Sequence, residues 1–262
     1  MINFKLLLIL LLLIIIFFFI FNVIKIENFT SKDKINNIKV SVIVASYNRP
    51  HNLQPNIDNL VKIKQIDNIY ILHGHKDYKK VIKHPKVINI DDWENNKKYY
   101  VWRILEFSKN CKNDNILILG DDLTVNQNHM NNLIKEYLKD KNNYYGSAKR
   151  SCTKNGYKIT CDKNDDCSYI LNRHLLSSKS VINNIWEQIK KEKKLFDWVI
   201  NHKGQGDDIV ICHVFKKLYN KVPKFVDGHV ESDNLDTENG FSTKKNYKHL
   251  ELRSNLCKLI HS

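Results

Sequence analysis

The sequence predicts an α/β domain, a mostly parallel β-sheet flanked by helices, behind one N-terminal transmembrane helix. Short aliphatic or β-branched runs alternate with segments whose apolar residues recur at helical spacing, which is the pattern of a sheet covered by helices. The run Ile116–Leu119 is apolar throughout, as in a strand buried on both faces of a parallel sheet. A longer unbroken apolar run, Leu6–Phe21, predicts the membrane helix.

The N-terminal apolar run continues to Ile24, and at about 1.5 Å per residue it nearly spans the ~30 Å hydrocarbon core of a bilayer. No small-residue cleavage site follows it, which favours an uncleaved signal anchor over a cleaved signal peptide. We therefore expect an anchor at residues 1–25, a short stem at 26–37 and one globular domain at 38–262.

The orientation of this anchor is weakly encoded. More lysines follow the apolar run than precede it, so the positive-inside count favours a cytoplasmic domain. The glycosylation sequon at Asn28 and the six cysteines instead favour a lumenal domain with some disulfide bonds. We expect the lumenal arrangement.

The first half of the domain contains four expected strands, at 40–45, 68–72, 87–90 and 115–119. Helical spacing predicts helices around 53–61, 101–105 and 130–138. The order of these elements implies a mostly parallel sheet covered by helices. The glycine-rich dinucleotide fingerprint and the Walker loop are both absent, so a bound nucleotide would be held by carboxylates and metal.

The second half is less regular. Strands are expected at 144–148 and 168–171, a helix at 181–189, and another helix after the turn at 204–208. Between the two strands lies a turn-rich segment with three cysteines. Cys152 with Cys161 is the first choice for a disulfide, because Gly156 between them allows a hairpin, whereas Cys212 is expected to be a buried thiol.

Two carboxylates, Asp121 and Asp122, follow directly where the buried strand ends at Gly120. Ligands of open α/β sheets bind at the carboxyl ends of the strands. Adjacent carboxylates repel each other unless a cation shares them, and oxygen ligands suit Mg²⁺ or Mn²⁺. The alternative is that one of the pair only caps a following helix.

The formal net charge is +14, which is compatible with an anionic partner. The lysines are spread along the whole chain among Asn and Ile, without a compact basic block or an aromatic-basic module. We therefore expect no nucleic-acid partner.

Three motifs in order resemble those of glycosyltransferases with the GT-A fold, especially the exostosin-like and family 2 types. They are Ser46-Tyr47-Asn48-Arg49-Pro50 after the first strand, Gly120-Asp121-Asp122 after a later one, and the acidic pair Asp207-Asp208. The resemblance covers about Lys39 to Leu218, and an N-terminal anchor is usual for Golgi enzymes of this kind. It implies a type II membrane glycosyltransferase of the Golgi or ER lumen, of the hexosyl or N-acetylhexosaminyl type.

The resemblance also implies roles for individual residues. Ser46, Tyr47, Asn48, Arg49 and Asp121 would bind a UDP- or GDP-sugar donor, and Asp122 would hold Mn²⁺ or Mg²⁺. Arg103 is a further candidate for a phosphate contact. Asp208 or Asp207 would take the proton of the hydroxyl on a glycan or glycoprotein acceptor; Asp208 is preferred for this catalytic role, with Asp207 capping the helix. His229 and His249 are candidate third metal ligands, although a histidine in such a place is more often a surface or packing residue.

Two departures from the family pattern leave alternatives open. Gly120 stands where the first acidic residue of the D-x-D motif is usual, which favours a non-catalytic GT-A-like domain that binds a glycan or a partner enzyme. The second strand ends in Leu72-His73-Gly74-His75, where many relatives place a carboxylate or amide against the base. The nucleotide of the donor therefore stays open between UDP and GDP.

Overall fold

The computed structural model describes residues 12–21, 33–161, 167–172, 174–228, 230–231 and 248–262. The chain divides into two compact units, Met1–Ile38 and Lys39–Ser262. In the first unit, residues 12–21 and 33–37 are helical. Within the described ranges, no helix is both long and apolar enough to cross a membrane. Much of the expected anchor lies outside these ranges, so the membrane helix stays a prediction.

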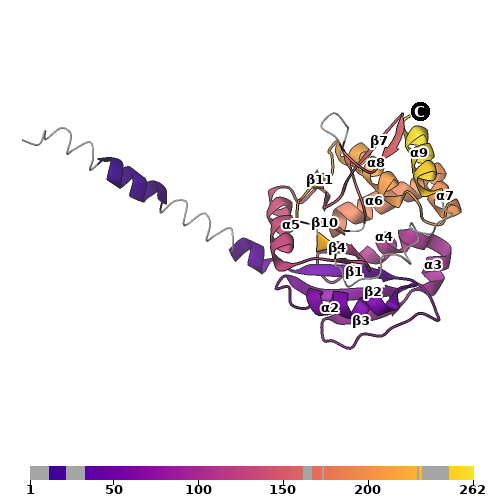
Figure 1. The fold of residues 1–262 in the computed structure, drawn as a ribbon, viewed down its shortest axis with the longest axis horizontal. Coiled ribbons are helices and arrows are strands. Elements are labelled where there is room, and N and C mark those ends of the chain that lie inside the picture. The colour runs from indigo at the N-terminus through magenta and orange to yellow at the C-terminus, as the bar shows by residue number, and fades with distance from the viewer. Residues whose placement is uncertain (1–11, 22–32, 162–166, 173, 229, 232–247) are drawn as a thin grey trace, which may run out of the picture. The chain divides into compact units, whose positions relative to one another are not determined.

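The second unit is built on a seven-stranded sheet in the order β11-β6-β10-β4-β1-β2-β3 (Figure 1). Its strands are β1 (Val40–Ser46), β2 (Ile66–His73), β3 (Val87–Asp91), β4 (Asn115–Gly120), β6 (Tyr145–Gly146), β10 (His174–Ser178) and β11 (Lys224–Phe225). β1 to β4 are mutually parallel, whereas β10 runs antiparallel to both of its neighbours. The predicted α/β class with a mostly parallel sheet is confirmed.

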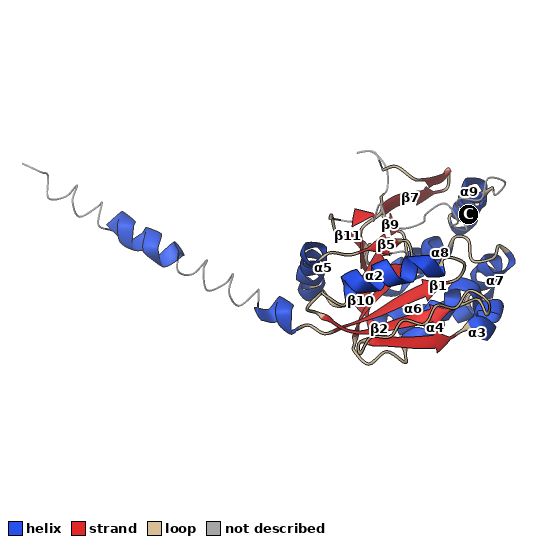
Figure 2. Ribbon diagram, turned by 60° about the horizontal axis from the view of Figure 1, so that its bottom comes forward, coloured by secondary structure: helices blue, strands red, loops and turns tan. Residues whose placement is uncertain are grey.

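Helices cover both sides of this sheet, as Figure 2 shows with helices in blue and strands in red. The helices are α2 (Leu53–Leu60), α3 (Trp93–Tyr99), α4 (Arg103–Ser108), α5 (Gln127–Lys139), α6 (Lys179–Lys191), α7 (Lys193–Asn201), α8 (Asp207–Tyr219) and α9 (His249–Ile260), with short 3₁₀ turns at Pro50–Asn52 and Tyr100–Trp102. The helical segments predicted from spacing all lie within or beside these elements.

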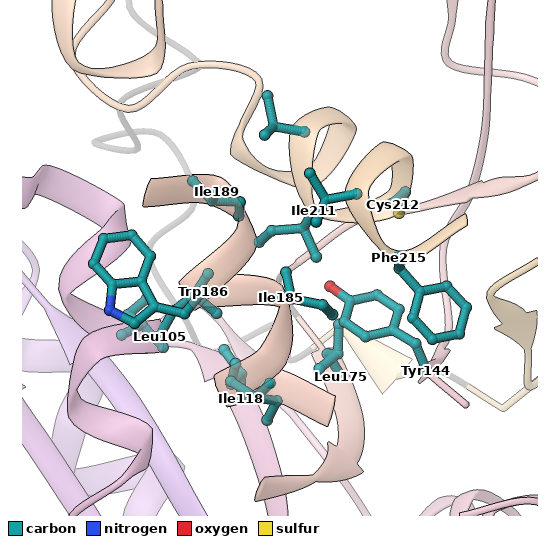
Figure 3. Packing of buried hydrophobic residues seen from close by; sticks show 14 of the residues in the cluster. Leu105, Ile118, Tyr144, Leu175, Ile185, Trp186, Ile189, Ile211, Cys212 and Phe215 are labelled. Carbon is teal, nitrogen blue, oxygen red and sulfur yellow. The ribbon is translucent and has the colours of Figure 1, made fainter. Parts of the chain in front are cut away.

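The main apolar core lies between one face of the sheet and the helices α4, α6 and α8. Figure 3 shows Ile118 of β4 and Leu175 of β10 beside Ile185 of α6, and the ring of Phe215 in α8 beside that of Tyr144. Because side chains alternate along a strand, the neighbouring buried residues such as Leu117 face the opposite side, which leaves α2 and α5 to cover them. Both faces are therefore closed, as the all-apolar strand β4 predicts.

Two small sheets complete the domain. β5 (Leu123–Thr124) pairs with β12 (Val230–Glu231), and β7 (Lys149–Thr153) pairs with β8 (Gly156–Lys158) and β9 (Tyr169–Ile170). The C-terminal helix α9 packs on β7, β8 and α8.

The expected disulfide between Cys152 and Cys161 is wrong. The predicted hairpin forms, with Gly156 at a φ of +123°, but Cys152 bonds to Cys257 of α9, 105 residues later. The bond partner was not predictable from spacing, because it belongs to a helix that contacts the hairpin only in the folded chain. Cys212 is buried in α8 as expected, and burial raises the pKa of its thiol.

Candidate active site

The motifs predicted to bind a ligand converge on one edge of the sheet. β1 and β4 are parallel neighbours with Ala45 opposite Gly120, so both strands end at the same edge. The segment Tyr47–Arg49 follows β1 there, and Asp121 and Asp122 follow β4. Parallel strands thus bring together two segments that are separated by about seventy residues in the sequence.

Arg49 joins the two carboxylates at this edge. Its guanidinium donates to Asp121 and, at 3.0 Å, to Asp122 Oδ2. The side chains of Arg49, Asp121 and Asp122 are only 11%, 6% and 11% exposed. Burial disfavours the charged arginine, but the two carboxylates outweigh burial and raise the pKa of Arg49. The positive charge that adjacent carboxylates require is therefore supplied here by a side chain.

The donor set at this edge also fits a hard divalent cation. In the part of the chain that the structure describes, no group of three or more His, Cys, Asp or Glu side chains is arranged to hold a metal ion. Mg²⁺ is nevertheless commonly held by one or two carboxylates together with substrate phosphates, and Asp121 and Asp122 provide that number. His229, expected as a third ligand, lies outside the described residues.

His249, the other candidate third ligand, lies at the start of α9 and not beside Asp122. Its Nδ1 is hydrogen-bonded to Gln205 Oε1. Burial and the nearby positive charge of Arg253 lower the pKa of His249 to about 4, so its imidazole is neutral at physiological pH. His249 thus belongs to the surroundings of the second acidic pair.

The remaining residues of the first motif lie around the same edge. Ser46 ends β1 and is buried, and Asn48 lies between Tyr47 and Arg49 in the turn that follows. Tyr47 is 46% exposed, and its ring lies 5.3 Å from the ring of His75, which in turn lies 4.4 Å from that of Tyr78. An exposed aromatic group therefore borders the carboxylate site, at the ends of β1 and β2.

Arg103 is buried in an ion pair of its own, near enough to Asp121 and Tyr47 for their charges to act on it. It donates to Asp92 Oδ2 at 2.6 Å and to the carbonyl of Leu72 at 3.3 Å, and both members of the ion pair are less than 5% exposed. A Cβ at Gly74 would lie 2.7 Å from the guanidinium, so a glycine is required there. Burial outweighs the ion pair and lowers the pKa of Arg103. These contacts give Arg103 a structural role in holding the end of β2.

The second acidic pair lies at the N-terminus of α8. Gly206 is the N-cap, in the left-handed region with a φ of +79°, and a Cβ there would lie 2.5 Å from Leu256. Both the conformation and the contact require glycine. Asp207 and Asp208 are the first two residues of the helix, where the helix dipole stabilises carboxylates. Neither is the N-cap, so Asp207 does not have the predicted capping position.

The two carboxylates of this pair have different partners. Asp208 is 2% exposed, and its Oδ2 accepts from Arg253 Nη1 at 2.7 Å. Its other oxygen, Oδ1, is buried and accepts no hydrogen bond among the described residues. Asp207 is half-buried and accepts from Asn172 Nδ2 at 3.2 Å. Burial, together with the charge of Asp208, raises the pKa of Asp207 to about 6.

Strand β10 connects the second acidic pair to the first. β10 runs antiparallel to β4, and its first residue, His174, pairs with Leu119 at the end of β4. Asn172 precedes β10, and it therefore lies at the edge of the sheet where Asp121 and Asp122 follow β4. Since Asn172 also donates to Asp207, both acidic pairs border one edge of the sheet.

Asn172 and Arg253 are functional candidates that were not predicted. Asn172 lies in a segment without periodicity, so nothing local marks it. Arg253 had a detectable signal, because Leu252, Leu256 and Leu259 recur at helical spacing around it. That spacing predicts an amphipathic helix, although it does not reveal that the arginine pairs with Asp208.

Residues 40–262 match the glycosyl transferase family 64 domain. No curated protein matches the chain. The match covers all three motifs as well as α9, and it confirms the predicted glycosyltransferase class. The narrower GT-A assignment, exostosin-like or family 2-like, stays a prediction.

Proposed function

The chain belongs to glycosyl transferase family 64, and from this membership we propose that it transfers a sugar from a UDP- or GDP-sugar to a hydroxyl of a glycan or glycoprotein. It is a glycosyltransferase by its family. The observation that carries the fuller proposal is the placement of two acidic pairs, Asp121–Asp122 and Asp207–Asp208, on one sheet edge.

The first acidic pair is suited to the donor. A nucleotide-sugar loses a diphosphate, whose developing negative charge requires fixed positive groups. Arg49 already contacts both carboxylates and provides one such group. Asp122, with Asp121 beside it, would hold Mn²⁺ or Mg²⁺, and that cation when bound neutralises charge on the leaving diphosphate.

The second acidic pair is suited to the acceptor. Asp208 is held by Arg253, and its buried Oδ1 accepts no hydrogen bond among the described residues. A sugar hydroxyl that reached this buried oxygen on acceptor binding would donate to it and be oriented for attack. The raised pKa of Asp207 lets the pair take up one proton near pH 6, which is the property required of a general base.

The metal assignment is tested by measuring sugar transfer with and without EDTA. Asp122→Asn keeps the shape but removes the charge that holds a cation, so it should abolish transfer and remove the metal dependence of donor binding. Asp114→Asn is the matched control, because the Asp114 side chain is 92% exposed and precedes β4 at the opposite edge. Full activity of Asp122→Asn, or of the wild type in EDTA, contradicts the metal assignment.

A second candidate function is non-catalytic binding of a glycan or partner enzyme. Gly120 supports it, because glycine replaces the first carboxylate of the usual D-x-D motif. Under this alternative, nucleotide-sugars or glycans bind but no nucleoside diphosphate is released from any donor. Release of the diphosphate in a donor screen excludes it.

We also propose that residues 1–25 anchor the enzyme in the Golgi or ER membrane with the domain in the lumen. The described helical residues 12–21 support this, since they are all apolar and exposed, with Phe17 at 67% and Phe19 at 71%. The disulfide between Cys152 and Cys257 fits an oxidising compartment. Extraction of the full chain from membranes by alkaline carbonate contradicts the anchor.

A further inference from the structure

Arg253, the partner of Asp208, is held in place by the β7–β8 hairpin. Its Nη1 donates to the hydroxyl of Tyr157 at 3.2 Å, and its guanidinium carbon lies 5.0 Å from the centre of the Tyr157 ring. The backbone N–H of Tyr157 donates to Ser254 Oγ, also at 3.2 Å. Tyr157 therefore contacts both the guanidinium of Arg253 and the side chain of the next residue, Ser254.

The disulfide ties the next turn of the same helix to the same hairpin. Cys257 follows Arg253 by four residues, so the two side chains lie on one face of α9. Its partner Cys152 is directly opposite Tyr157 in the β7–β8 pairing. One rung of the hairpin, Cys152 with Tyr157, thus holds two successive turns of α9.

The charge of Arg253 lowers the pKa of Asp207, against burial and the charge of Asp208, which both raise it. The groups described around Asp207 and Asp208 are Asn172, Arg253, His249, Tyr144, Tyr157 and Cys212. Burial keeps the two tyrosines and Cys212 protonated by raising their pKa values, and His249 is neutral because its pKa is lowered. Among these described groups Arg253 alone carries a positive charge. Displacing Arg253 leaves burial and the charge of Asp208 to raise the pKa of Asp207 further.

We propose that Tyr157 is a positioning residue for sugar transfer, which together with the Cys152–Cys257 disulfide holds Arg253 on Asp208 and so keeps a positive charge beside the acidic pair. This inference rests on the proposed role of the pair as a general base. Tyr157 does not contact the acidic pair through any described hydrogen bond; it acts through the guanidinium.

The disulfide makes this positioning dependent on oxidation. A dithiol that reduces Cys152–Cys257 yields two cysteine thiols and is itself oxidised to a disulfide, after which only non-covalent contacts with Tyr157 and its neighbours hold α9. Reduction should therefore change the acidic pair in the same direction as removal of the Tyr157 side chain.

The test is the pH profile of kcat for wild type, Tyr157→Phe and Tyr157→Ala. Loss of a nearby opposite charge raises a carboxyl pKa by about one unit or more, so the acidic limb should move up by about one pH unit in Tyr157→Ala. Tyr157→Phe keeps the ring under the guanidinium, so it should move the acidic limb of the profile less than Tyr157→Ala does. Donor KM should stay unchanged, because the donor is assigned to Asp122 and Arg49.

Tyr137→Phe is the matched control. Tyr137 is also a buried tyrosine, and its hydroxyl donates to Asn115 Oδ1 at 2.7 Å, at the opposite end of β4. Its loss removes a hydrogen bond of the same kind away from the acidic pair, so the acidic limb should not move. Equal displacement in Tyr137→Phe contradicts a specific role for Tyr157.

A second measurement makes the inference independent of turnover. Carboxyl NMR titration of Asp207 should show a higher pKa in Tyr157→Ala, and in wild type after treatment with dithiothreitol, than in the oxidised wild type. Unchanged titration in folded protein under both conditions overturns the inference. If Tyr157→Ala fails to fold, the Asp207 titration in Tyr157→Phe and in the dithiothreitol-treated wild type tests the inference in its place. Absence of transfer by the wild type with every donor would instead contradict the proposed function.

Discussion

Replacing Arg103 by Met tests whether this arginine supports the fold or binds the donor. Met keeps an unbranched side chain beneath Gly74 but removes the charge. Asp92 is 2% exposed, so its carboxylate would be left in a site that water does not reach. Its remaining described side-chain contact is the Asn95 amide at 2.8 Å, and the carbonyl of Leu72 also loses a donor.

The expected cost is large because the charge is buried. Removing one partner of a buried ion pair typically costs about 3–5 kcal/mol, and exposures of 4% and 2% give no reason to discount this for solvent screening. The loss should appear as a lower midpoint in urea unfolding with an unchanged slope. Adding Asp92→Asn to Arg103→Met should recover much of the lost free energy of unfolding, since no unpaired charge remains buried.

The kinetic result separates the two roles of Arg103. A structural arginine leaves donor KM unchanged in the fraction of protein that is folded. A loss of less than about 1 kcal/mol, of the size of an exposed ion pair, together with a tenfold higher donor KM would refute the structural role. That outcome would return Arg103 to the predicted phosphate contact.

Three further predictions concern the second acidic pair and α9. The rate of sugar transfer should fall as pH decreases through about 6, because an acidic pair that has already bound a proton cannot take up the hydroxyl proton. A pH–rate profile that is flat across this range would contradict the general-base role. Cys257→Ser should lower the free energy of unfolding by about 2–5 kcal/mol, measured by urea unfolding without reductant, and an unchanged midpoint would argue against the bond with Cys152. Gly206→Ala should destabilise by about 1–3 kcal/mol, since alanine at a φ of +79° is strained and its Cβ meets Leu256; a wild-type melting temperature would contradict this.

Local sequence patterns predicted the centre of the fold. β4 contains an unbroken aliphatic run and β1 a β-branched run interrupted by Ser41, and such strands are typical of a sheet covered on both faces. The turn residues after them are polar, so the position of Asp121 and Asp122 at the sheet edge followed from the strand alone. Gly204 and Gly206 likewise predicted a tight turn before α8, and both have a positive φ.

The elements that were missed depend on contacts between distant segments. β10 is short and carries no alternating pattern, and it forms because β4 and β6 flank it. The Cys152–Cys257 bond requires α9 to dock on the hairpin, and the Arg253–Asp208 pair requires it to pack against α8, across separations of 105 and 45 residues. Spacing within one segment contains no information on such partners, which is why the hairpin was predicted and its disulfide was not.

The pairing of Arg49 with both carboxylates likewise depends on contacts between segments that are distant in the sequence. Each motif was assigned by resemblance to the donor site, but only the parallel pairing of β1 with β4 brings the guanidinium between Asp121 and Asp122. The sequence therefore predicted the components of the donor site and not the ion pair that joins them.

The catalytic role of Asp208 is tested most directly by comparing wild type with Asp208→Asn in a screen of UDP- and GDP-sugars, measuring donor Kd by calorimetry and turnover by release of the nucleoside diphosphate. We expect wild type to turn over at least one donor. Asp208→Asn should bind that donor with a similar Kd but turn it over about 10²-fold more slowly, the size of a lost general base. The matched control Asp114→Asn should behave as wild type in both measurements. Undiminished turnover by Asp208→Asn would contradict the catalytic role of the second acidic pair.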